Sequence, residues 1–181
     1  MTAAQTRVVD AALALFAVHG VNGTSLQMIA DEIGVTKAAV YHQYPTKDEI
    51  VVAVMEVELG RLAAAVDAAE AEPDRARALD VLVEQVVAVA VERRRVVGAL
   101  EHDPVVQRLM ATHGSFPELF VRLNRLLAGG RPDVASRAAA AMFLSAVGGA
   151  VAHPLVADLD DEVLRDHLVR VSRRLFDLPE P

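Results

Sequence analysis

The sequence predicts an all-α protein, and three observations support that prediction. Apolar residues recur at i, i+3 and i+4 along most of the 181 residues, which is the spacing of an amphipathic helix. The alternation of apolar and polar residues that is typical of strands is hard to find. Hydrophobic residues, mostly alanine, valine and leucine, make up 53% of the chain, which is enough for a sizeable core. We therefore expect helices packed on helices.

The first two helices are expected near the N-terminus. The first covers residues 6–19, and Gly20 is placed to end it in a left-handed cap. The second covers residues 25–33, with Thr24 as its cap and Gln27 bonding back in a capping box. Both place apolar side chains on one face, so they are expected to pack against each other.

A third and a fourth helix follow closely. Thr36 caps a short third helix, which Pro45 stops. Thr46 to Glu49 form another capping box, which opens a long fourth helix. The second and third helices, joined by a tight turn that contains Gly34, make a helix-turn-helix, a motif whose second helix enters the major groove of DNA.

The only lysines of the chain, Lys37 and Lys47, occupy related positions. Each directly follows a threonine that begins an expected helix, whereas every other basic residue is arginine. Backbone N–H groups at a helix start favour an anion, so a lysine beside each one suggests a phosphate. A GC-rich genome would explain the shortage of lysine, but it does not explain the position of these two.

A longer pattern spans the first fifty residues. It consists of Arg7, Ala11, Ala12, Leu13, Phe16, Gly20, Thr24, Ser25, Ile29, Ala30, Gly34, Val35, Thr36, Lys37, Val40, Tyr41, Tyr44, Thr46 and Lys47. In order and spacing this pattern resembles the DNA-binding domain of the tetracycline-repressor (TetR) family of transcription regulators. The segment from Tyr41 to Lys47 is the most distinctive part of the resemblance. The rest of the chain matches that family only in length and helical character.

The resemblance implies which residues meet DNA. They are Thr24, Ser25, Thr36, Lys37, Ala38, Tyr41, His42 and Lys47. Tyr41 would place its hydroxyl on a phosphate, although it could instead be a packing residue of the helix. Many relatives carry Gly-Thr where this chain has Ala38 and Ala39, so a hydroxyl donor is lost while contact with a thymine methyl stays possible.

Composition limits the function classes. The net charge is −7, and the first fifty residues hold three basic and five acidic side chains, which argues against indiscriminate binding to nucleic acid. A helical interaction module without DNA binding therefore stays open as an alternative. The absence of cysteine excludes disulfides and thiolate catalysis, and we expect no cofactor and no metal site. Without a secretory signal or a long uninterrupted apolar run, the protein is expected to be cytoplasmic and soluble.

The remaining residues are expected to form a helical domain for effector binding and dimerisation. We place the DNA-binding domain at residues 1–46 and the second domain at residues 47–181. Helix breaks are expected at Pro73, at Pro104 and near Pro117. The arginine triplet 93–95 is interpreted as the solvated end of a helix rather than as a nucleic-acid patch.

Two copies of the chain are expected to pair through the last two helices. Residues 132–152 are rich in small side chains, and residues 160–176 carry a narrow apolar seam, which together suit a four-helix bundle made from two copies. The expected interface consists of Met142, Ser145, Gly149, Leu164, Leu168, Val171 and Leu175. Ordinary packing within one chain is the alternative. A homodimer would suit a palindromic, double-stranded DNA operator.

By the resemblance, a small apolar or amphipathic effector binds among the C-terminal helices and releases a repressor from its operator. The polar candidates for that ligand site are His102, His113, Asn124 and His153. A small all-α enzyme that uses His102 and Asp103 is a rival, but the two side chains are adjacent and nothing else supports it. We therefore assign no catalytic residue.

Overall fold

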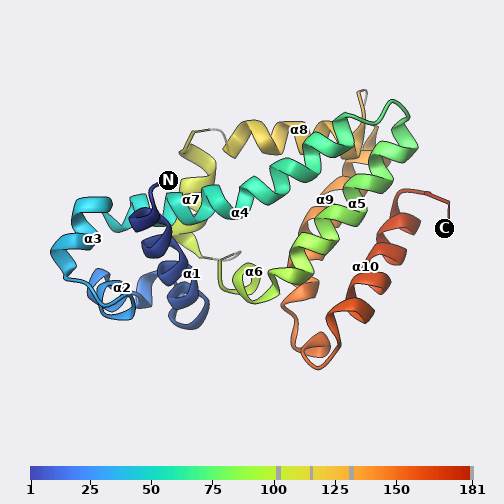
Figure 1. Ribbon diagram of the computed structural model, residues 1–181. Coiled ribbons are helices and arrows are strands. Elements are labelled where there is room, and N and C mark those ends of the chain that lie inside the picture. Colours follow the sequence, from blue (N-terminus) through green and yellow to red (C-terminus); the bar gives the residue numbers. More distant parts are fainter. Residues whose placement is uncertain (101–102, 115, 131–132, 180–181) are drawn as a thin grey trace.

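Every regular element in the described part of the chain is a helix, as Figure 1 shows. The structure is a computed structural model that describes residues 1–100, 103–114, 116–130 and 133–179. The helices are α1 (Ala3–Gly23), α2 (Leu26–Glu32), α3 (Lys37–Gln43), α4 (Lys47–Glu70), α5 (Arg75–Glu92), α6 (Arg94–Leu100), α7 (Pro104–Thr112), α8 (Phe116–Ala128), α9 (Val134–Val151), the 3₁₀ helix η1 (Pro154–Val156) and α10 (Asp161–Leu175). The prediction of an all-α fold is confirmed.

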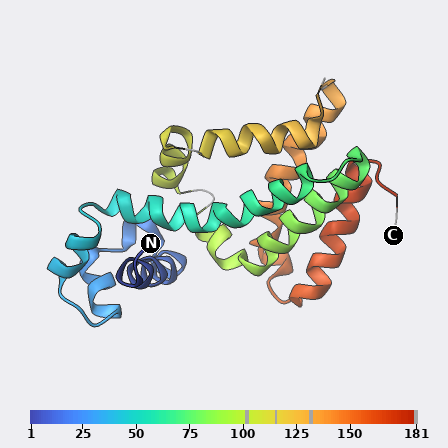
Figure 2. The same ribbon diagram turned by 45° about the horizontal axis from the view of Figure 1, so that its top comes forward.

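The long helix α4 connects the two ends of the molecule. Figures 1 and 2 show α1, α2 and α3 gathered at one end, and α5, α9 and α10 lying side by side at the other. Helix α4 runs between these ends, packing first against α1 and then against α5 and α8.

Helix α1 begins earlier than predicted and contains the expected left-handed glycine. Thr2 caps it in a full capping box with Gln5, a pattern that the sequence prediction missed. Gly20 has φ of +70°, a conformation that a side chain would strain, so the helix breaks there as expected. One further turn follows, and Val21 folds back into the core with no exposed surface.

The core consists of two clusters that share α4. The first surrounds Phe16, Ile29 and Val40 in the N-terminal helices, and the second joins α5, α8, α9 and α10. Helix α4 contributes Val54 to the first cluster and Val66 to the second. Residues far along the chain, from α6, α7 and α8, complete the first cluster; they are Leu100, Val106 and Phe116.

The predicted fifth helix is two helices, because the chain turns at Arg93. Helix α5 ends at Glu92 and α6 begins at Arg94, with Arg93 as the cap between them. The prediction of a solvated arginine triplet needs correction at Arg93, which is bound to Glu58 on α4. Helix α6 packs against α1 on one side and α9 on the other.

Helix α9 is long and apolar enough to cross a membrane, judged by length and composition alone, and it is the one such helix in the described part of the chain. Only 22% of that helix is buried inside the chain. Its outward face includes Val134, Met142, Ser145 and Ala146. A soluble monomer rarely leaves so much of an apolar helix uncovered.

Candidate functional site

The helix-turn-helix is built by two capped helices and a glycine turn. The hydroxyl of Ser25 accepts from the Met28 N–H and begins α2. The turn passes through Gly34, at φ +69°, after which the Val35 N–H donates to the Ala30 carbonyl at 2.9 Å. Thr36 then caps α3 by accepting from the Ala39 N–H, as predicted. These bonds fix the direction in which α3 leaves the turn.

Helix α3 presents its polar side chains outward. Val40 is fully buried and Tyr44 is 8% exposed, so these two hold the helix on the core. Burial, with a smaller contribution from Glu56, raises the pKa of Tyr44, which keeps its hydroxyl neutral. Residues 36–39, Tyr41 and His42 all face solvent.

Tyr41 and Lys37 lie together on this face. The Tyr41 side chain is 45% exposed, which disfavours the alternative that it is a packing residue. The Lys37 ammonium nitrogen lies 5.6 Å from the centre of the Tyr41 ring, within the range of a cation–π contact. This contact orients the lysine one turn before the tyrosine, so a phosphate could meet both groups at once.

Thr24 has a different position from the one predicted. Its side chain is 2% exposed, and its hydroxyl donates to the Gly20 carbonyl at 2.9 Å. Ser25, rather than Thr24, caps α2, and Gln27 donates to Asp31 instead of bonding back. Thr24 is therefore corrected from a DNA contact to the residue that closes the end of α1, while Ser25 stays exposed beside the helix start.

Lys47 also has protein partners. Its ammonium donates to the carbonyl of Val21 at 2.8 Å and to that of Thr24 at 3.1 Å. These bonds join the first turn of α4 to the end of α1. The sequence placed Lys47 beside a phosphate, whereas in the structure its ammonium donates to two backbone carbonyls at the end of α1.

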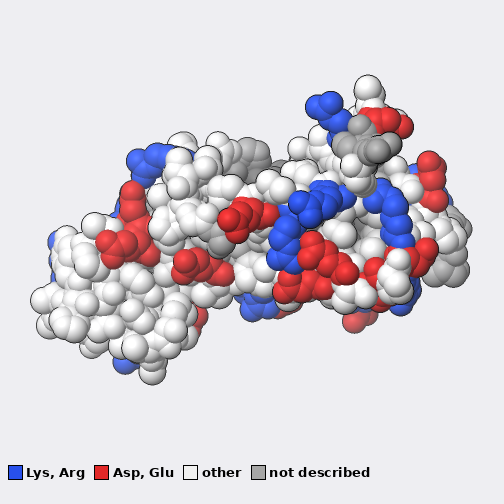
Figure 3. Space-filling model, turned by 90° about the horizontal axis from the view of Figure 1, so that it is seen from above, with Lys and Arg blue, Asp and Glu red and all other residues white. Residues whose placement is uncertain are grey.

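Few charges lie on the helix-turn-helix end. Figure 3 shows this end mostly white, whereas blue and red side chains alternate over the other helices. Arg7 is occupied by the Ile33 carbonyl, to which its Nη2 donates at 2.8 Å. The candidate surface for DNA therefore consists of Lys37, Tyr41, His42 and the N-termini of α2 and α3, without a broad basic patch.

A separate cavity lies among α4, α5, α6, α7, α8 and α9. Its volume is about 270 Å³, just below the usual range of about 300–1,000 Å³ for ligand pockets. Apolar side chains line most of it, including Leu59, Val89, Met110 and Phe120. A larger groove of about 820 Å³ lies between α5 and α10, and charged side chains form most of its lining.

One ion pair supplies the charge in this cavity. Arg93 donates through Nε to Oε2 of Glu58 at 2.8 Å and through Nη2 to Oε1 at 2.7 Å. The side chains are 23% and 13% exposed, respectively. The hydrogen bonds to Glu58 raise the pKa of Arg93 further above its already high value, so the guanidinium stays charged.

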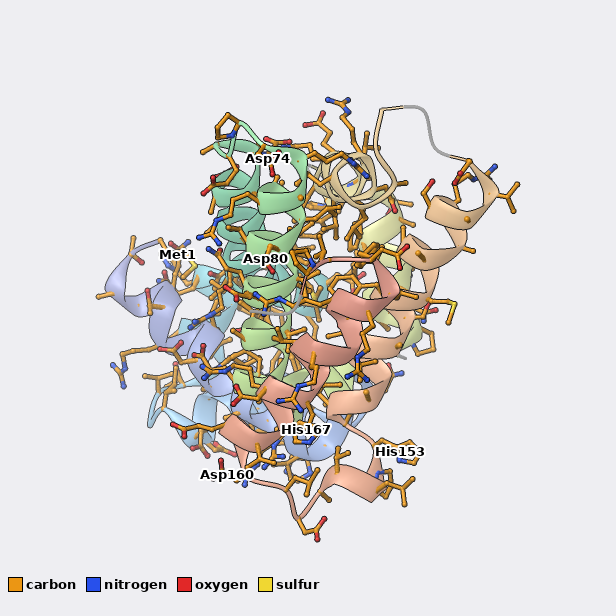
Figure 4. The ribbon with its side chains drawn as sticks, turned by 90° about the vertical axis from the view of Figure 1, so that its right-hand side faces the viewer. Met1, Asp74, Asp80, His153, Asp160 and His167 are labelled. Carbon is orange, nitrogen blue, oxygen red and sulfur yellow. The ribbon has the colours of Figure 1, made fainter. Side chains whose placement is uncertain are left out.

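The polar residues predicted for the ligand site lie elsewhere. His113 caps the end of α7 on the surface, and Asn124 is exposed on α8. His153 caps η1 through Nδ1, and Figure 4 shows it at the edge of the molecule. None of the three lines this cavity, so the structure gives their ligand-binding assignment no support. His102 lies outside the described residues.

The predicted dimer residues divide into two groups. Met142, Ser145 and Val171 are exposed, and Gly149 is half-buried, so they lie on an accessible face of α9 and α10. Leu164 is 3% exposed and packs in the second core cluster of its own chain. Leu168 and Leu175 are half-buried against that same cluster. The seam prediction is therefore corrected at Leu164, which packs within its own chain, whereas the assignment of Leu168 and Leu175 to the interface stays a prediction.

These features define a class of protein. A helix-turn-helix whose second helix presents its polar side chains outward is a DNA-binding motif, and here one long helix joins it to a helical bundle that contains an apolar cavity. Residues 8–54 match the family model described as bacterial regulatory proteins, tetR family. The N-terminal helices of the chain are therefore similar to the DNA-binding domain of TetR family transcriptional regulators.

Solved structures share the fold over the whole chain. A tetR family regulatory protein from Rhodococcus RHA1 is 21% identical, with a TM-score of 0.75 over 99% of this chain and 100% of that chain. The fatty acid degradation regulator FadR from Bacillus halodurans is 16% identical, with a TM-score of 0.72 over 97% and 96%. A TetR family regulator from Thermus thermophilus is 20% identical, with a TM-score of 0.69 over 97% and 100%. No match was found among curated proteins.

Proposed function

We propose that the chain is a homodimeric repressor that binds a palindromic operator through α3 and leaves it when a small effector enters the cavity. The observation that carries this proposal is the outward face of α3, where Lys37, Tyr41 and His42 lie exposed beside the capped start of the helix. Helix N-termini favour phosphates, and the side chains of a recognition helix meet base edges. Residues 1–46 would form the DNA-binding part and residues 47–181 the regulatory part.

The uncovered face of α9 and α10 supports a homodimer. Met142 is 60% exposed, Val171 is 62% exposed, and small residues beside them allow a second helix to approach closely. A two-fold dimer places the same face of each copy in contact and sets two recognition helices about 34–36 Å apart or a multiple of that distance.

The arrangement of helices supports control by an effector. The cavity is lined by α4, which starts against the DNA-binding helices, and by α6, which packs on α1. A ligand that binds one arrangement of these helices more tightly than another shifts the population between them. The affinity of the chain for that ligand would then be coupled to its affinity for DNA.

Gel shifts with DNA from upstream of the chain's own gene test the proposal. We expect the protein to bind this DNA at low salt and Tyr41→Ala to weaken the complex. A melting temperature close to that of the wild type would show that the variant is folded. Failure of the wild type to bind at low salt would exclude the proposal that the chain is a DNA-binding regulator. Normal affinity of Tyr41→Ala would show that this side chain does not contact DNA.

A further inference from the structure

We propose that the cavity selects a small uncharged ligand with an apolar body and a single carbonyl or hydroxyl head, and that this head binds at the Glu58–Arg93 ion pair. The inference rests on the proposed function, because it assigns a chemical class to the effector of that same cavity. It concerns the charge and polarity of the ligand, which must match the side chains around the cavity.

The lining sets the number of polar groups that the ligand can carry. Among the described residues around the cavity, only Glu58 and Arg93 have polar side chains. The other walls are aliphatic, aromatic or methionine side chains, such as Leu62, Val97 and Leu144. A polar group placed against those walls would lose its hydrogen bonds to water without replacement. The ligand is therefore apolar except at the end that meets the ion pair.

The ion pair retains hydrogen-bonding capacity for such a head. Arg93 uses Nε and Nη2 toward Glu58, and a guanidinium has five N–H groups, so further donors remain. Each carboxylate oxygen of Glu58 accepts one of these bonds and has a second lone pair. A ligand carbonyl can accept from Arg93, and a ligand hydroxyl can also donate to Glu58.

Charge balance excludes an ionised head. The two side chains neutralise each other, and both are largely removed from water, at 23% and 13% exposure. A carboxylate head would leave one negative charge in excess in the cavity, and an ammonium head would leave one positive charge. An uncompensated charge at a mostly buried site is strongly disfavoured, whereas a neutral head leaves the pair intact.

The head would bind at the junction of helices that lead to the DNA-binding end. The Arg93 carbonyl accepts from the N–H groups of Val96 and Val97, so this residue forms the elbow between α5 and α6. Its partner Glu58 belongs to α4. A head that changes the geometry of this pair would shift α6 relative to α4, which are the two helices that contact both the cavity and α1.

A matched ten-carbon series tests the head-group preference. The probes are 1-decanol, 2-decanone, decanoate and decylamine, each below its micelle concentration at neutral pH, with binding to the full chain measured by calorimetry. We expect the two neutral compounds to bind the wild type at least about tenfold more tightly than either ion, as an excess buried charge requires.

Removal of one charge supplies the second arm of the experiment. In Glu58→Gln the guanidinium is left without its counter-ion, so decanoate should gain at least about tenfold in affinity while 2-decanone changes little. The control is Glu56→Gln, which alters an exposed carboxylate on the same helix outside the cavity and should leave the whole series unchanged. Thermal melting establishes that both variants are folded.

The possible failures have different meanings. If decanoate binds the wild type as tightly as the neutral compounds, or gains nothing in Glu58→Gln, the head-group inference is overturned while the effector cavity stands. If no compound binds the wild type, the cavity does not take ligands of this class and the inference is overturned, while DNA binding and dimerisation are tested by their own experiments. If Glu58→Gln unfolds, the inference is tested by the wild type alone, through the ratio of its affinities for the neutral and the charged compounds.

Discussion

Lys37 and Lys47 begin neighbouring helices but have different surroundings. Lys37 lies exposed on α3 over the ring of Tyr41, where it can meet a phosphate. Lys47 donates to the carbonyls of Val21 and Thr24, where it closes the end of α1. The same residue type after the same kind of cap therefore has a proposed binding role in one place and a structural role in the other.

The two alanine variants should separate these roles. Lys47→Ala removes two charge-assisted hydrogen bonds, so we expect the free energy of unfolding to fall by about 1.5–3 kcal/mol. Lys37→Ala should leave stability nearly unchanged and lower the slope of log K against log salt for DNA binding by about 0.9. Urea denaturation and binding titrations at several salt concentrations measure the two quantities. The assignment is contradicted if Lys47→Ala is fully stable or if the salt slope responds to Lys47 rather than to Lys37.

For single residues, the sequence predicts those features that depend only on neighbouring residues in the chain. The caps Thr36 and Thr46 and the left-handed Gly20 follow from their neighbours in the chain, and the structure confirms them. The burial of Thr24 and the partners of Lys47 depend on how α1 and α4 meet, which no short pattern contains. The Glu58–Arg93 pair joins residues from different helices and could not be predicted for the same reason.

Helix α6 was not predicted as a separate helix, and it packs closely against the end of α9. A Cβ added at Gly98 would lie 2.8 Å from the Cβ of Ala152, so the glycine lets α6 approach the end of α9. The apolar periodicity continues across Arg93, and only the tertiary contacts of Arg93 with α4 show where α5 ends. Helix α6 thus lines the cavity and packs against both α9 and α1.

Gly98→Ala should therefore displace α6. Because the nearest atom is fixed to the backbone of Ala152, a helix must move, and we expect a loss of about 1–3 kcal/mol in unfolding free energy. The control is Gly60→Ala on α4, where an added Cβ meets nothing within 4 Å; it should stabilise the protein by about 0.5–1 kcal/mol. Thermal and urea unfolding of both variants measure the effects. Equal stabilisation by the two alanines would show that α6 and α9 are not in close contact.

The whole molecule has apolar surface that a single copy leaves uncovered. Helix α9 is largely exposed, while Leu164 of α10 belongs to the core of its own chain. The sequence correctly predicted which helices are rich in small and apolar residues. It could not assign the seam of α10 between its own core and a partner, because both uses require the same spacing of leucines.

Substitution on the exposed face should disrupt the proposed dimer. Met142→Glu places a charge in the centre of that face, so we expect a monomer by light scattering coupled to size exclusion. The matched control is Val18→Glu, a side chain 75% exposed on α1 at the opposite end, which should leave the dimer intact. A Met142→Glu protein that stays dimeric would place the interface elsewhere.

The central claim is that two α3 helices of one dimer bind a symmetric DNA sequence. Selection of bound duplexes from a random pool, followed by sequencing, tests it most directly, since the operator does not have to be known. We predict that the wild type enriches an inverted repeat whose half-sites are separated by a whole number of turns of about 10–10.5 base pairs, and that Tyr41→Ala enriches it weakly or not at all. A pool that stays random at low salt, or a motif without two-fold symmetry, would contradict the account.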